Sequence, residues 1–231
     1  MATFDPGKER KLPLRPHDLP TPEPLKKFME QGWAPSPLDG LKKSLVAPYT
    51  TARRKKLSES FPGKRLVIPA GTFKTRSNDT DYRFRPHTAF AWLTGISGSD
   101  AVPDSVLVLE PNGSGHDSLL FIHPRSTREN SEEFYRNARH GEFWVGRRMT
   151  LEETEFAYDI KVRHINSLDD FLVSAKDSLT VRGEDEYVDD RVKESTEDAT
   201  FLSWLSEARL VKDAFEINEM QKAIDATHRG F

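Results

Sequence analysis

The side chains with the greatest capacity for chemistry in this sequence are its histidines and a pair of aspartates. None of the seven histidines has the H-x-x-x-H spacing that places two metal ligands on one face of a helix. Asp79 and Asp81 form a D-x-D pair, which can bind a metal or a phosphate, but the surrounding loop is rich in serine, asparagine and aspartate. Such loops favour turn residues that bond their own backbone. We therefore expect no metal site from these residues. The histidines are at positions 17, 87, 116, 123, 140, 164 and 228.

No nucleophile is set up by a recognisable motif either. Cysteine is absent, which excludes thiol catalysis, disulfides and cysteine-based metal sites. The serines lack the G-x-S-x-G elbow, and the G-x-x-G between Gly95 and Gly98 is followed by no P-loop lysine. We therefore predict no catalytic residue in this chain.

The charge balance and the apolar runs limit the possible partners. The 34 basic and 37 acidic residues are well mixed and give a net charge of -3, so the chain has no basic field that would attract nucleic acid. We interpret the basic run at 53–56 as a solvated helix face. No apolar run approaches the roughly 18 residues that span a membrane, and the sequence start does not have the pattern of a signal peptide. We expect a cytoplasmic protein that binds neither nucleic acid nor membrane.

The apolar runs that must position any functional residue predict an α/β fold. Two β-prone runs at 105–110 and 118–123 are separated by P-N-G-S-G-H-D, a strong turn signal, and so predict a hairpin. Both runs are apolar on both faces, so helices must cover both sides of the sheet. We predict a mixed β-sheet of about five or six strands with helices on both faces. Further strands are expected at 66–68, 160–164 and 179–182.

Helices are predicted from capping residues and from apolar spacing. Thr50 or Thr51 would cap a helix that buries Leu57 and Phe61. Thr150 is followed three residues later by glutamate, which is the capping-box pattern. Further helices are expected at 131–138, at 167–177 and from Ala199 through Leu202 to Leu205. Between the last two, the sequence at 183–198 is expected to be an acidic, solvated segment. The final helix begins with a second capping pair, Asp213 and Glu216, and carries Ile217, Met220 and Ile224 on one face.

Proline content divides the chain. Nine of its fifteen prolines lie within the first 48 residues, so we interpret 1–46 as a proline-rich extension. One ordered piece is expected there, a helix capped by Thr21, begun by Pro22 and ended by Gly32, after which Trp33 would dock on the domain.

Three segments resemble one known family. F-R-P-H-T-A-F-A-W-L-T-G at 84–95 resembles the F-R-x-[NDH]-[ST]-x-F-x-[YW]-L-T-G segment in the amino-terminal domain of Xaa-Pro aminopeptidases (aminopeptidase P), of the creatinase and prolidase superfamily. The W-V-G-R-R at 144–148 is similar to its W-x-G-R-R, and 207–227 is similar to the segment that leads into its catalytic domain. The matching residues are Phe84, Phe90, Leu93, Thr94 and Gly95, then Trp144, Gly146, Arg147 and Arg148, then Arg209, Lys212, Asp213, Glu216, Ile217, Met220 and Ala223.

The resemblance implies a creatinase-like amino-terminal domain at 47–208, followed at 209–231 by a linker and helix that lead to an absent catalytic domain. In this family a following "pita-bread" domain holds two divalent metals, commonly manganese, on two Asp, one His and two Glu. A metal-bridged hydroxide then cleaves the bond between an N-terminal residue and proline. The resemblance implies that this chain has no cofactor and is inactive alone. Its implied partners are its own catalytic domain, further copies of itself and proline-containing peptides.

The resemblance also suggests two residues for the rim of an active site or for oligomer contacts. Trp92 offers a large rigid surface, and Arg85 could hold a peptide carboxylate through two hydrogen bonds. Alternatively, Trp92 lies in the core, and Arg147 and Arg148 pair with acidic side chains of the chain. For the whole chain, the alternatives are a peptide- or protein-binding module from a catalytically dead relative, and the amino-terminal domain of a prolidase or creatinase.

Overall fold

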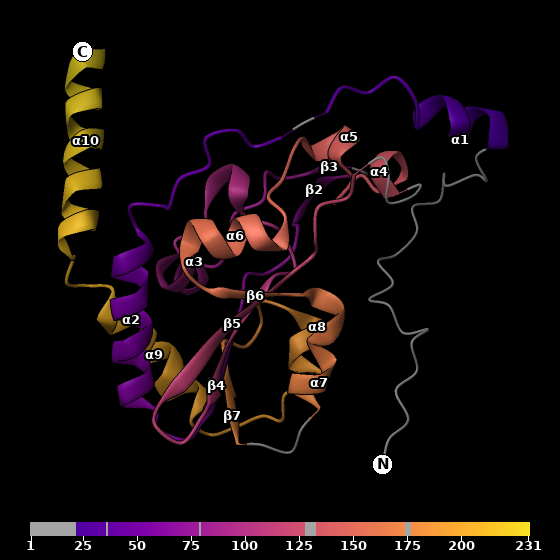
Figure 1. Ribbon diagram of the computed structural model, residues 1–231. Helices are drawn as coiled ribbons and strands as arrows, with labels where there is room; N and C mark the ends of the chain where they lie inside the picture. Colours follow the sequence, from indigo (N-terminus) through magenta and orange to yellow (C-terminus); the bar gives the residue numbers. More distant parts are fainter. Residues whose placement is uncertain (1–21, 36, 79, 128–132, 174–176) are drawn as a thin grey trace.

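A five-stranded mixed sheet forms the centre of the computed structural model, which describes residues 22–35, 37–78, 80–127, 133–173 and 177–231. Its strands are β1 (Arg65–Pro69), β4 (Val106–Pro111), β5 (His116–Ile122), β6 (Lys161–His164) and β7 (Ser178–Thr180). The order across the sheet is β6-β5-β4-β1-β7 (Figure 1). β4 is antiparallel to both of its neighbours, whereas β6 and β7 join the edges as parallel strands. The predicted mixed sheet is confirmed.

The central hairpin is also confirmed, and its side chains explain why both faces need a cover. β4 and β5 pair with Val106 opposite Phe121, and the turn between them closes with a hydrogen bond from Asn112 N to Gly115 O. Alternate residues of these strands enter two different apolar cores, as expected from the period of two in a strand. Leu107, Leu109, Leu120 and Ile122 enter the first core, and Val106, Val108, Leu119 and Phe121 enter the second.

Among the described residues, four helices cover the first face. They are α2 (Ala47–Ser60), α3 (Thr88–Thr94), α6 (Leu151–Tyr158) and α9 (Asp198–Ala208). Leu57 of α2, Phe90 of α3 and Phe201 of α9 are almost completely buried in this core. α6 begins with the capping box predicted from Thr150 and Glu153. Of the apolar positions expected in α9, Leu205 is buried but Leu202 is exposed.

The second face is covered by shorter elements, one of them in the segment expected to be acidic and solvated. The 3-10 helix η3 (Ile165–Ser167) contributes Ile165 to the second core, and α7 (Asp169–Leu172) and α8 (Glu186–Asp189) lie on the same side, as Figure 1 shows for these two helices. Val188 and Val192 are buried in the second core, so the expectation of a wholly solvated segment is wrong. The reason is that the segment connects β7 to α9 and is thereby held against the sheet; Asp185 is buried there too and caps α8 by accepting a hydrogen bond from Tyr187 N.

Three helix starts differ from the predicted ones. α1 (Glu23–Met29) begins one residue later than expected, with Pro22 at its cap position. α2 begins at Ala47 with Pro48 in its first turn, where a missing N–H costs little. The hydroxyls of Thr50 and Thr51 consequently donate to the Ala47 carbonyl oxygen instead of capping the helix. For α3, Pro86 and Gly95 predict a helix that starts at the proline and ends before the glycine. The helix is capped by His87 instead, so Pro86 lies one residue before the cap.

The remaining described elements flank this body. They are α1 (Glu23–Met29), β2 (Thr75–Ser77), β3 (Thr80–Asp81), η1 (Gly98–Asp100), α4 (Glu133–Arg136), α5 (Glu142–Val145) and α10 (Ala214–Gly230). Trp33 does dock on the domain, with edge-to-face contacts to Phe134 at 5.1 Å and Phe143 at 5.9 Å. Within the described residues, no helix has the length and apolar character needed to cross a membrane. Thr21, Asp79, Ser131 and Ala175, on which some expectations rested, lie outside the described residues.

Candidate functional site

Several histidines of the described residues lie in structural networks, among them His123 and His140. Over the part of the chain that the structure describes, no three His, Asp or Glu side chains are grouped so that they could hold a metal ion. The rings of His123 and His140 stack with centroids 4.0 Å apart, and His123 Nε2 lies 3.0 Å from Glu133 Oε1. Burial alone would raise the pKa of Glu133, but hydrogen bonds from His123 and Ser126 outweigh it and lower the pKa to about 2.

The aromatic segment at 84–95 is held by its backbone geometry. Thr94 is fully buried, and its hydroxyl donates to Phe90 O and accepts from Ile96 N. Gly95 ends α3 with φ at +79°, a conformation that favours glycine. A Cβ at Gly95 would lie 2.3 Å from Cγ1 of Val46, so α2 and α3 can approach only with glycine there. The fold therefore needs this part of the motif for packing.

Two arginines of α2 bind the C-terminal end of α3. Arg53 Nη1 donates to Trp92 O, and Arg54 Nη1 donates to Leu93 O, each at 2.8 Å. The expected solvated face is therefore wrong for these two residues, which are buried, although Lys55 on the same helix is exposed. The physical reason is that carbonyl groups at a helix C-terminus lack partners in the helix and attract cations. Burial lowers the pKa of Arg54 to about 10, although Asp159 opposes this shift.

Arg53 also reaches the third family-like segment. Its Nε and Nη2 donate to Oδ2 of Asp213 at 2.9 Å and 2.6 Å. Asp213 caps α10 in the predicted capping box with Glu216. One buried guanidinium therefore joins α2, the end of α3 and the start of α10. Sequence reasoning missed this contact because its partners lie 160 residues apart and share no motif.

The two rim candidates lie in different environments. Trp92 is 9% exposed, its ring lies 5.3 Å from the Arg53 guanidinium carbon, and its Nε1 is buried without a hydrogen-bond partner in the described structure. Arg85, in the loop before α3, is exposed. Within the first motif, Phe84 is half-buried and contacts Phe73, while Leu93 is buried. A role of Arg85 or Trp92 at an active-site rim stays a prediction.

The W-x-G-R-R segment is engaged within the chain. Trp144 is 57% exposed, but its Nε1 donates to Tyr135 O. Gly146, with φ at +80°, ends α5. Arg147 Nη2 lies 2.6 Å from Oε1 of Glu153, so this arginine pairs with a carboxylate of the chain, as the alternative proposed. Burial lowers the pKa of Arg148, whose Nη1 lies 3.5 Å from Nδ1 of His140.

The start of α10 has charged residues and the helix itself has an apolar stripe. Lys212 is exposed and hydrogen bonds to the carbonyl of Arg209. Arg209 is half-buried, and burial lowers its pKa. α10 has no buried residue, and Figure 1 shows it leaving the body beside α2 and extending away from it. Its stripe consists of Ile217, Met220 and Ile224, which are 55%, 49% and 59% exposed.

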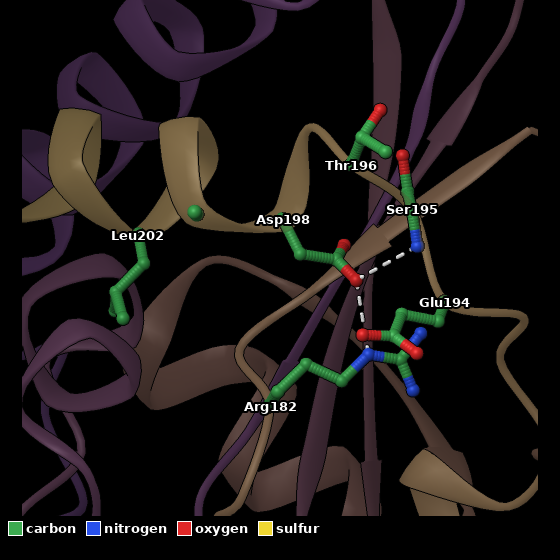
Figure 2. Close-up of a pocket in the computed structure, with 7 residues that line it drawn as sticks. Arg182, Glu194, Ser195, Thr196, Asp198 and Leu202 are labelled. Carbon is green, nitrogen blue, oxygen red and sulfur yellow. Dashed lines mark hydrogen bonds and ion pairs between the residues drawn. The ribbon is translucent and has the colours of Figure 1, made fainter.

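A cavity of about 400 Å³ lies at the start of α9. In Figure 2, the Asp198 carboxylate points toward Arg182 and Ser195. It accepts hydrogen bonds from Arg182 Nε at 2.9 Å, from Ser195 N at 3.1 Å and from Thr180 N at 3.0 Å. These bonds tie α9 to β7, so the carboxylate serves the fold. The remaining lining residues are Glu194, Thr196, Ala199 and Leu202.

Comparisons with known proteins agree with the fold and the motifs. Residues 50–181 match the family described as aminopeptidase P, N-terminal domain. The chain is 44% identical to Xaa-Pro aminopeptidase 1 of Streptomyces coelicolor, over 99% of this chain and 46% of that protein. Xaa-Pro aminopeptidase 2 of the same organism is 40% identical, over 90% of this chain and 44% of that protein.

A solved structure of proline aminopeptidase P II from Yersinia pestis has a similar fold. It matches with a TM-score of 0.57 and 24% identity, over 75% of this chain and 41% of that chain. The mixed sheet with helices on both faces is therefore that of an aminopeptidase P amino-terminal domain. The chain belongs to the aminopeptidase P N-terminal domain family. It spans about half the length of the curated relatives it matches.

Proposed function

We propose that this chain is the amino-terminal part of a Xaa-Pro aminopeptidase, whose complete form removes the residue that precedes proline at the N-terminus of a peptide. The observation that carries this proposal is the exposed apolar stripe of α10. Three large apolar side chains at helical spacing are about half exposed, within the segment at 207–227 that resembles the one leading into the family's catalytic domain. A helix with one apolar face is stable when another surface covers that face. The catalytic part of the enzyme would supply the cover.

The chain's own role is then structural. The described residues do not offer a ligand set for the divalent metals, commonly manganese, that this family uses, so we assign no catalytic step to them. We propose that the metals bind in the catalytic part and that this chain shapes the rim of its active site and contributes to a homo-oligomer. The domain boundaries near 47 and 208, the cytoplasmic location and the binding of proline-containing peptides stay predictions.

A chimera tests this function. The part of Streptomyces coelicolor Xaa-Pro aminopeptidase 1 that matches this chain would be replaced by this chain, which is 44% identical to it. We expect the chimera to cleave a tripeptide with proline in second position, but not the same tripeptide with alanine there. This chain by itself should be inactive. A Xaa-Pro dipeptide, tested on the full-length parent of this chain, distinguishes an aminopeptidase from a prolidase.

A matched pair of variants tests the stripe. Ile224→Glu places a charge on the apolar face of α10, and Asn218→Glu places the same charge on another side of the helix. We expect the first to abolish activity of the chimera and the second to retain it. A folded, inactive chimera would contradict the proposal. If this chain then bound proline-containing peptides without cleaving them, a binding module would replace it.

A further inference from the structure

Arg53 has an unusual set of contacts for a residue in the middle of a helix. Its side chain is 8% exposed, and its donors reach two different elements. Nη1 donates to Trp92 O at the end of α3, and Nε and Nη2 donate to Oδ2 of Asp213 before α10. The guanidinium also lies over the Trp92 ring, a favourable cation–π position. A buried arginine in this position depends on all of its partners, because removal of one partner leaves a buried charge unpaired and destabilises the fold.

Asp213 has two functions through its two oxygens. Oδ1 accepts from Glu216 N and thereby caps α10, whereas Oδ2 accepts from Arg53. Glu216 completes the capping box by accepting from Asp213 N, and its Oε2 lies 3.5 Å from Arg53 Nη2. The start of α10 is therefore fixed in position by the same carboxylate that begins the helix.

The direction of α10 depends on this first turn. The helix has 17 residues and none of them is buried. At its first turn, Phe215 packs against Tyr49 of α2 with ring centroids 5.5 Å apart, next to the Arg53 contact. A long helix attached at one end turns a small displacement of that end into a large displacement of the other.

We propose that Arg53 is a positioning residue: it fixes the direction of α10, and through α10 the position of the catalytic part relative to the α3 segment. The second half of this statement rests on the proposed function. The first half does not, because it concerns only this chain. Trp92 then serves as the support of Arg53, through its carbonyl and its ring, in addition to filling the core.

The first half can be tested in the chain as it is, because the chain contains no cysteine. Cysteines at the exposed positions Lys56 in α2 and Ala226 in α10 would carry two spin labels, and pulsed EPR would give the distribution of distances between them. We expect a narrow distribution in the otherwise unsubstituted chain. Arg53→Met should broaden it, because the first turn of α10 loses its partner in α2.

Two further variants distinguish loss of the contact between Arg53 and Asp213 from a general loss of structure. Asp213→Asn keeps a side-chain oxygen that can cap α10 but removes the charge that Arg53 binds, so we expect a broadened distribution with unchanged helix content. Arg54→Met is the matched control: Arg54 is equally buried and binds the neighbouring carbonyl of α3, yet its described hydrogen bonds do not reach α10. It should leave the distribution narrow.

The outcomes decide the proposal. Broadening in Asp213→Asn and in Arg53→Met, without broadening in Arg54→Met, would support it. An unchanged distribution in Asp213→Asn would overturn it, whatever Arg53→Met does, and so would equal broadening in Arg54→Met. If Arg53→Met does not fold, Asp213→Asn and Arg54→Met still decide.

The second half is tested in the chimera. A displacement of about 1 Å can cost an enzyme on the order of 100-fold in rate, so Asp213→Asn should lower kcat/KM for the proline tripeptide by up to about that factor. The double variant should lose no more activity than Arg53→Met alone, because the contact between Arg53 and Asp213 is already absent in that variant and the two effects then do not add. Broadened distances without any loss of activity would retain the fixed helix but overturn the role in catalysis. An inactive parent chimera would instead contradict the proposed function.

Discussion

The last two helices of the chain, α9 and α10, have the same kind of apolar pattern and opposite environments. In α9, Phe201 and Leu205 are fully buried, and Phe201 makes an edge-to-face contact with Phe61 at 5.3 Å. In α10, the stripe of Ile217, Met220 and Ile224 is about half exposed. Spacing thus shows that a helix has an apolar face, but it does not show what covers that face. For α9 the cover is the sheet of this chain, and for α10 we propose the catalytic part of the enzyme.

The largest expected change in the free energy of unfolding distinguishes α9 from α10. Phe201→Ala leaves a cavity in the first core and should lower the free energy of unfolding by about 3 to 5 kcal/mol. Ile224→Ala should change it by no more than about 0.5 kcal/mol, because the side chain contributes little to the core of this chain. Urea unfolding of the two variants measures both. A loss of similar size in Ile224→Ala would show that α10 already packs on this chain in solution.

A second pair applies the same comparison to the rim candidates. Trp92→Ala should cost about 3 kcal/mol or more, because the indole is 9% exposed and packs in the first core. Arg85→Ala, at an exposed loop position, should stay within about 0.5 kcal/mol. Thermal unfolding of both variants is the measurement. Wild-type stability of Trp92→Ala would mean that the tryptophan is accessible, as a rim residue must be.

A smaller effect is expected at the cap of α6. Thr150 accepts a hydrogen bond from Glu153 N, and Glu153 reciprocates by accepting from Thr150 N. Thr150→Ala should cost about 1 kcal/mol of global stability, because α6 buries Ala157 and Tyr158 against the sheet and cannot fray independently. Thr150→Ser, which keeps the hydroxyl, is the control and should retain the urea midpoint. If the alanine variant only lost helix signal and kept the urea midpoint, α6 would unfold locally, independently of the rest of the domain.

The smallest expected effect is the pH dependence of stability that comes from His87. Burial lowers the pKa of His87 below its ordinary value of 6.5; Glu184 opposes the shift, while Arg209 and Lys74 add to it. The unfolded chain therefore binds this proton more readily. The stabilisation from neutral His87 is complete above pH 6.5 and is lost as the pH falls below it.

His87→Asn isolates this contribution. Asparagine can cap α3 in place of histidine but does not titrate. The free energy of unfolding of the variant should fall less steeply than that of the unsubstituted chain as the pH is lowered from about 7 to about 5. Urea titrations at several pH values measure the two slopes. Parallel slopes would show that the His87 proton does not contribute to stability.

Much of the fold could be predicted because it depends on interactions between near neighbours. The hairpin follows from a turn of a few residues between two apolar runs, and the capping boxes at Thr150 and Asp213 join residues three apart. The aromatic motif ends at Gly95, whose positive φ also follows from local helix ending. These patterns sufficed for the mixed sheet and the helices on both faces, whereas the family followed from the resemblance of three segments.

The environments of the charged residues could not be predicted in this way. Arg53 and Arg54 belong to a basic run that the sequence places on a solvated face, and they are buried only because the C-terminal end of α3 packs against them. In the acidic segment, Asp185 and Val188 are buried because β7 and α9 bring that segment back to the sheet.

Sequence by itself determined where α10 begins, through its capping box, and that it has one apolar face. Only the tertiary structure decided that Asp213 binds Arg53 and that the apolar stripe finds no cover in the described part of this chain. The physical reason is range. Capping and amphipathic spacing act over one or two helical turns, whereas burial of a charge or of a face depends on which distant surface the fold brings against it.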